Sequence, residues 1–303
     1  MKSERKPQFR LTHNISEQNN KKLFIKSAAT EDAYDFLQDV IKKEKISRHF
    51  FGDKATVISG TLRDNCIYYP YIEYPTVEQL IIDDINIDNR NFGISIIHKY
   101  ISFISNLPSK ECRPERFIEE FGISYNEFKK PVNCLLFGPI DCIPSNILVN
   151  HNTWYIIDHE WTYEFPIPID FIIYRGIYSL VIHLQELIKS KVSKEHPVTL
   201  LQGYGNNRTY FPLSWLEIVM SMEIPIKKLV NYERLFQKKA FVMNKPTHLR
   251  LKNPPEKIFS IKPIPFWISF SISRISIPIR YILYFFHFIL IKFRSSHSGW
   301  FDD

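Results

Sequence analysis

The stretch IDCIPSNILVNHNTWYIIDHEW, residues 140–161, places Asp141, Asn146 and Asp158 around two short apolar runs. The segment between them predicts two strands, at 147–149 and 154–157, joined by a polar turn at 151–153. If this hairpin forms, its return strand brings Asp158 back beside Asn146. The sequence therefore predicts that both side chains can contact one metal ion.

These residue types suit phosphoryl transfer from a nucleotide, which asks the protein mainly for positioning and charge. The reaction needs a carboxylate to orient the attacking hydroxyl, oxygen ligands for Mg²⁺ and a cation on the phosphates. Mg²⁺ prefers carboxylate and amide oxygens and shares its shell with phosphate and water. The plainer alternative is that Asp141 and Asn146 are ordinary turn residues.

The spacing resembles the catalytic core of the protein-kinase-like fold, in which D-x-x-x-x-N precedes a strand that ends in Asp. The pair DCIPSNILV and IIDHEW resembles the aminoglycoside phosphotransferase and choline kinase type, whose second motif is Asp-x-Glu. The Glu-Trp ending is also similar to kinase-like modules that accompany methyltransferases and glycosyltransferases of bacterial surface polysaccharides. This resemblance implies an α+β, two-lobed fold with a small N-terminal β-sheet lobe and a larger helical C-terminal lobe.

The resemblance also implies roles for single residues. Asp141 would be the catalytic base, Asn146 and Asp158 the ligands of Mg²⁺, and Lys26 in LFIKSA the strand lysine that holds the phosphates of ATP. A carboxylate of the following helix would pair with Lys26, and the choice stays open among Asp32, Asp35 and Asp39.

Two further segments take their roles from the same resemblance. Residues Pro70 to Pro75, PYIEYP, would form the hinge between the lobes, with Ile72 and Tyr74 meeting the adenine ring. Asp170 resembles a structural aspartate that anchors the catalytic loop in these enzymes.

Hydrophobic periodicity and turn signals supply the remaining elements. Strands are expected at 9–15, in a second segment that ends near Ala28, at 55–62 and at 66–72. Helices are expected from Thr30 to about Lys45, after a capping box at Thr76, and at 89–107, 117–128, 170–190, 213–222 and 226–241. We divide the chain into a β-rich lobe at 1–74, a helical lobe at 75–262 and an aromatic, basic tail at 263–303.

The sequence departs from the kinase-like pattern in two places. The position two residues before Asp141, commonly His, is Pro139, and no glycine occurs among the 25 residues before Lys26. The first strand and the glycine-rich loop are therefore expected to be missing. The chain could belong to a longer protein, hold nucleotide without that loop, or bind without transferring phosphate.

Composition narrows the class of partner. The 303 residues carry a formal charge of +7, which suits anionic ligands and anionic membrane surfaces. Nucleic-acid binding is not expected, because no dense basic stripe or aromatic RNA-binding pattern is present. Four scattered cysteines and a polar N-terminus favour a reducing, cytoplasmic location. The tail would either attach to the inner face of the membrane or form a terminal helix packed on the helical lobe.

The favoured hypothesis is an ATP- and Mg²⁺-dependent phosphotransferase that acts on a hydroxyl of a small molecule or glycan, in surface-polysaccharide synthesis. The second hypothesis is an inactive kinase-like module that docks a methyltransferase or glycosyltransferase at the membrane. The third is a glycosyltransferase accessory domain that uses Asp83 and Asp84 within LIIDDINID.

Overall fold

The computed structural model describes residues 5–18, 20–84, 93–191, 200–202 and 210–241. The predicted tail at 263–303 lies outside these residues, as do 242–262 and Asp88. The first elements are η1 (Pro7–Phe9), β1 (Leu11–Gln18), β2 (Lys21–Ala28), η2 (Glu31–Ala33), α1 (Tyr34–Phe51), β3 (Thr56–Val57), β4 (Thr61–Arg63) and β5 (Cys66–Pro70).

The remaining elements are mostly helical. They are α2 (Val77–Asp84), α3 (Ile94–Ser105), β6 (Ser109–Cys112), α4 (Glu115–Phe121), η3 (Tyr125–Glu127), β7 (Val132–Leu135), β8 (Gly138–Pro139), η4 (Pro144–Asn146), β9 (Ile147–Asn150), β10 (Thr153–Ile156), β11 (Thr162–Tyr163), β12 (Ile167–Pro168), α5 (Ile169–Lys191), β13 (Leu200–Gln202), β14 (Tyr210–Pro212), α6 (Leu213–Met220) and α7 (Ile226–Ala240).

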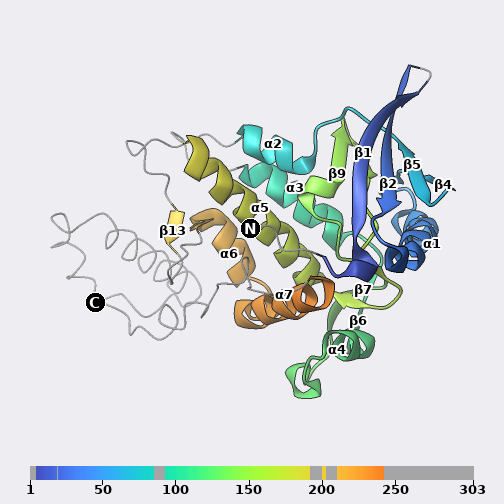
Figure 1. Ribbon diagram of the computed structural model, residues 1–303. Helices are drawn as coiled ribbons and strands as arrows, with labels where there is room; N and C mark the ends of the chain where they lie inside the picture. Colours follow the sequence, from blue (N-terminus) through green and yellow to red (C-terminus); the bar gives the residue numbers. More distant parts are fainter. Residues whose placement is uncertain (1–4, 19, 85–92, 192–199, 203–209, 242–303) are drawn as a thin grey trace, which may run out of the picture.

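The N-terminal part is built on an antiparallel sheet with the strand order β1-β2-β5-β4. The predicted hairpin forms β1 and β2, and its turn carries Asn20 in the left-handed region, at φ 61°. Lys26 lies in the middle of the sheet, opposite His13 on one side and Ile67 on the other. The mixed α+β fold, with a small sheet followed by a helical part, is confirmed and is consistent with the kinase-like arrangement (Figure 1).

Helix α1 covers this sheet and runs longer than predicted. Its buried face continues past Lys45, since Glu44, Ser47 and Phe51 are buried on the same side of the helix as Leu37. The helix ends where Gly52 takes a positive φ of 53°, which glycine adopts without steric cost.

The strand expected at 55–62 divides into two elements that belong to different sheets. Strand β3 pairs in parallel with β10, while β4 joins the N-terminal sheet. Gly60 lies between them, and a Cβ there would come within 2.3 Å of the Ile67 side chain, so only glycine lets the chain pass. The N-terminal segment therefore contributes a strand to the sheet that carries the 140–161 hairpin.

The helical part follows the predicted order, with α5 at its centre (Figure 1). Thr76 caps α2 as expected, because its Oγ1 accepts the backbone N–H of Gln79 at 2.9 Å. The sequence reading missed the short strands β6, β7 and β12, which form one sheet. Within the ranges described above, no helix is both long enough and apolar enough to cross a bilayer.

Candidate active site

The loop that carries Asp141 is fixed by short strands on both sides of it. Strand β8 pairs with β11, with Pro139 opposite Thr162, so Trp161 comes next to the loop. The backbone N–H of Trp161 donates to Asp141 Oδ2 at 2.9 Å. Gly138 allows the close approach of Ile167, whose Cδ1 would lie 2.3 Å from an added Cβ.

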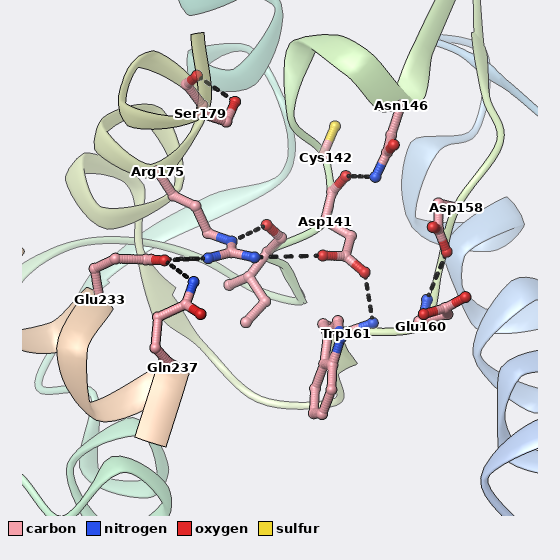
Figure 2. A network of polar contacts seen from close by, with 12 residues as sticks. Asp141, Cys142, Asn146, Asp158, Glu160, Trp161, Arg175, Ser179, Glu233 and Gln237 are labelled. Carbon is pink, nitrogen blue, oxygen red and sulfur yellow. Dashed lines mark hydrogen bonds and ion pairs between the residues drawn. The ribbon is translucent and has the colours of Figure 1, made fainter. Parts of the chain in front are cut away.

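The predicted hairpin forms and brings its two ends together. Strands β9 and β10 are antiparallel, and the backbone N–H of Ile157 donates to the carbonyl of Asn146 at 3.1 Å. The Asn146 side chain donates through Nδ2 to the backbone carbonyl of Asp141 at 3.0 Å. Asp158, one residue beyond Ile157, therefore lies beside Asn146, and Figure 2 shows both on the same side of Asp141.

This donor set fits Mg²⁺ shared with phosphate. Asn146 uses its NH₂ group for the loop, which leaves its Oδ1 as a hard oxygen ligand. Asp158 is 21% exposed and uses Oδ1 for Lys26 and for the N–H of Glu160, which leaves Oδ2. Across the described residues, no group of three or more His, Cys, Asp or Glu side chains could hold a metal alone, so the other ligands would come from phosphate and water.

Lys26 contacts carboxylates from the 140–161 stretch and not from α1. Its side chain is 2% exposed, and Nζ lies 2.9 Å from Asp158 Oδ1 and 2.7 Å from Glu160 Oε1. Burial alone would lower the pKa of Lys26, but the charges of Asp158 and Glu160 and their hydrogen bonds raise it above its ordinary value. Lys26 is thus held as a buried cation directly beside a metal-ligand candidate.

The expectation that Asp32, Asp35 or Asp39 pairs with Lys26 is wrong. Asp39 instead pairs with Lys43 at 2.8 Å, and the carboxylate that α1 turns inward is Glu44. Glu44 accepts the backbone N–H of Gly60 at 2.9 Å and the Arg48 guanidinium at 3.0 Å. The physical reason is that Asp32, Asp35 and Asp39 lie on the outward side of η2 and α1, while the inward face of α1 carries Glu44.

Glu160 contacts basic side chains from four separate segments. Its carboxylate contacts Lys26 and Arg5 and lies 3.6 Å from His13 Nε2, and its carbonyl accepts Lys43 Nζ at 3.0 Å. Burial would raise the pKa of Glu160, but Lys26, His13 and Arg5 hold it below its usual range. The Asp-x-Glu sequence therefore supplies one residue toward the metal position and one residue that binds the N-terminal part.

Asp141 sits in a setting that weakens its acidity. It is 6% exposed, and burial together with the nearby charge of Asp158 raises its pKa to about 7, against the opposing effect of Arg175. A carboxylate with a pKa near neutrality can accept a proton from a hydroxyl and release it again. This setting suits a general base.

Sequence reasoning missed Arg175, a buried arginine of α5 that holds the loop carrying Asp141. Its Nε donates to the carbonyl of Ile140 at 2.9 Å and its Nη2 lies 3.7 Å from Asp141 Oδ1. On the other side Nη1 contacts both carboxylate oxygens of Glu233, at 2.6 and 2.8 Å (Figure 2). The available signal was an arginine within the apolar first half of α5, facing a single acid on the buried face of α7.

Asp170 does not anchor the catalytic loop. Its Oδ2 accepts the backbone N–H of Ile224 at 2.8 Å, just before α7 begins. Asp170 opens α5, five residues before Arg175, so its carboxylate reaches the α6–α7 connection. Arg175 occupies the anchoring position instead.

The predicted hinge leaves part of its backbone unpaired. The backbone N–H of Tyr71 donates to the carbonyl of Lys22 at 3.1 Å, and the carbonyl of Pro75 accepts the N–H of Val149 at 2.9 Å. Between these bonds, the structure gives the N–H groups of Ile72 and Tyr74 no backbone partner among the described residues. Ile72 packs against the cluster under the N-terminal sheet, and the Tyr74 ring lies 5.4 Å from that of Tyr155.

The acids of the third hypothesis lie elsewhere. Asp83 and Asp84 form the last turn of α2, and Asp83 accepts a hydrogen bond from Gln79 at 2.7 Å. They share no described contact with Asp141 or Asp158.

His159 gives a pH-dependent prediction. It is buried, its Nε2 has no hydrogen-bond partner within the described part of the chain, and burial with the nearby charges of Lys26 and Arg48 lowers its pKa to about 3. Because the folded pKa is below the unfolded value of 6.5, this contribution to stability is complete above pH 6.5 and is lost as the pH falls toward 3. From pH 6.5 to 4.5 the loss is about 2 kcal/mol.

We expect His159→Gln to lose less stability than the parent protein over that interval, measured by urea unfolding in metal-free buffer. The same substitution at exposed His98 should leave the pH dependence as it is. Equal pH slopes for the parent and His159→Gln would contradict a buried neutral imidazole.

No protein-family model matches the chain, and no curated protein matches it. Among solved structures, the chain is similar to choline kinase LicA from Streptococcus pneumoniae, with 13% identity and a TM-score of 0.33. The match covers 74% of this chain and 77% of that one.

Proposed function

We propose that the protein is an ATP- and Mg²⁺-dependent phosphotransferase that acts on a hydroxyl group of a small molecule or glycan. One observation carries the proposal: the 140–161 hairpin brings Asp141, Asn146 and Asp158 together, and buried Lys26 contacts Asp158 at 2.9 Å. A base, two oxygen ligands and a cation are the groups that phosphoryl transfer needs.

Each residue has a defined task in this proposal. Asn146 and Asp158 would hold Mg²⁺, which neutralises phosphate charge when bound. Lys26 binds phosphate oxygens, and the free N–H groups at Ile72 and Tyr74 meet the adenine. Asp141 accepts the proton of the acceptor hydroxyl, while Trp161 and the loop keep its carboxylate in place.

The acceptor and the partners rest on the sequence resemblance at residues 158–161. That resemblance supports a glycan hydroxyl in surface-polysaccharide synthesis, with a methyltransferase or glycosyltransferase as partner. The net charge of +7 supports an anionic or lipid-linked acceptor near the inner face of the membrane.

Thermal unfolding with ATP tests the nucleotide site. At 100 times its Kd, ATP with Mg²⁺ should raise the free energy of unfolding by about 2.7 kcal/mol. Asp158→Ala should abolish this increase, whereas Asp53→Ala, in the exposed turn after α1, should retain it. The comparison uses the increase caused by ligand, because Asp158→Ala also removes a partner of Lys26.

The absence of any ATP effect on the parent protein would contradict the proposal and favour the docking module. An ATP effect without turnover of candidate acceptors would support a module that binds nucleotide without transferring phosphate.

A further inference from the structure

The first described residues form an arm across the molecule, 5–10, which we call the N-terminal arm. Arg5 makes an antiparallel bridge with Phe241, and the backbone N–H of Lys6 donates to the carbonyl of Ala240 at 3.2 Å. The arm therefore attaches to the end of α7 before it enters the N-terminal sheet. Its backbone position is fixed by these bonds.

The arm also packs against the segment that follows Asp158. The Phe9 ring lies 4.9 Å from Trp161 and 5.1 Å from Phe36, both in edge-on contact. Trp161 is the residue whose N–H holds Asp141. The arm is thus part of the wall around the catalytic loop.

Arg5 points from this arm toward the charged residues of the site. Its guanidinium contacts Glu160 Oε2, while Lys26 contacts the other oxygen of the same carboxylate at 2.7 Å. The charges of Asp141 and Asp158 also act on Arg5. Two cations from different segments therefore lie at one carboxylate next to the metal-ligand candidates.

The guanidinium has bonding capacity left over. Its side chain is 27% exposed, whereas Lys26 is 2% exposed and Glu160 is fully buried. Glu160 is the bonded partner of its side chain among the described residues, and a guanidinium has five N–H donors in a planar fork. This geometry matches phosphate oxygens.

We propose that Arg5 is a phosphate-binding residue of the site, placed by the N-terminal arm beside Lys26 and Glu160. The inference rests on the proposed function and adds a second cation to it. Glu160 orients Arg5 and Lys26 together, so that the partly exposed guanidinium binds phosphate oxygens beside Lys26.

Inorganic tripolyphosphate with excess Mg²⁺ tests this role without nucleotide or acceptor. Calorimetric titration of the full chain should show Arg5→Ala weakening the affinity by about 10-fold or more. Arg5→Lys should fall between, because an ammonium group cannot form the two-pronged contact. Lys6→Ala removes the same charge from the same arm and should change the affinity by less than about 2-fold.

Unfolding midpoints of the variants separate binding from folding. If Arg5→Ala does not fold, the tripolyphosphate affinity of Arg5→Lys is compared with that of Lys6→Ala. Arg5 variants that bind tripolyphosphate as Lys6→Ala does would overturn the inference, and so would a parent protein that does not bind it.

The outcomes also separate this inference from the proposed function. ATP binding that depends on Asp158 but not on Arg5 keeps the function and removes the inference. Tripolyphosphate binding that depends on Arg5, without any binding of ATP, keeps Arg5 as a phosphate-binding residue and removes the proposed function.

Discussion

Replacing Asp141 by asparagine is expected to reduce phosphoryl transfer by about 10²- to 10⁴-fold while ATP binding is retained. Asparagine keeps an oxygen to accept the N–H of Trp161, so the loop geometry should persist. It cannot accept the proton of the acceptor hydroxyl. Steady-state turnover and ATP affinity, measured on the same preparation, separate these two effects.

The same variant should be more stable than the parent protein at pH 8. Burial and Asp158 raise the pKa of Asp141 to about 7, so its folded pKa lies above its unfolded value of 3.8. Its contribution to stability is complete below pH 3.8 and is lost as the pH rises through about 7. Asp141→Asn removes this loss, and we expect it to raise the free energy of urea unfolding at pH 8.

Asp170→Asn is the matched control for Asp141→Asn. Asp170 also accepts a backbone N–H, from Ile224, but lies outside the site. Its substitution should leave turnover unchanged. Full turnover in Asp141→Asn would remove the assignment of a base to this position.

Replacing Arg175 by methionine should lower the free energy of unfolding by about 3–5 kcal/mol, the largest stability effect that we expect. The substitution leaves Glu233, which is 1% exposed, as an uncompensated buried charge. It also removes the donor to the Ile140 carbonyl and the packing of the guanidinium over Phe236, at 4.1 Å. Denaturant unfolding of purified variants measures the loss.

Two comparisons sharpen this result. Arg234→Met, on the exposed side of α7, should cost less than about 0.5 kcal/mol. The double variant Arg175→Met with Glu233→Met should recover part of the loss, because no buried charge is then left alone. A single Arg175→Met variant as stable as Arg234→Met would show that the Arg175–Glu233 pair does not hold the fold together.

The hairpin and the helices were accessible from sequence because local signals specify them. Two short apolar runs and a polar turn predicted β9 and β10, and the cap at Thr76 predicted the start of α2. Strand β3 was not accessible as a separate element, because its two residues pair with β10, far along the chain. The boundaries at 74 and 262 stay predictions.

The candidate site was only partly readable for a similar reason. Asp141, Asn146 and Asp158 lie on one hairpin, so their proximity follows from local structure. The partners of Lys26 depend on how the N-terminal sheet meets that hairpin, which spacing along the chain does not record. Arg175 could have been found from the sequence, because a cation within the apolar first half of a helix needs an acid nearby to neutralise it.

The parallel pairing of β3 with β10 restricts how the two parts of the molecule can move. Besides this pairing, the backbone N–H of Ile58 donates to the carbonyl of Ile156 at 2.9 Å, directly after β3. The N-terminal sheet is held at two further places, where Lys6 bonds to Ala240 and where Pro75 accepts the N–H of Val149. A rotation of the sheet away from the hairpin would have to break these bonds, so they keep Lys26 within reach of Asp158.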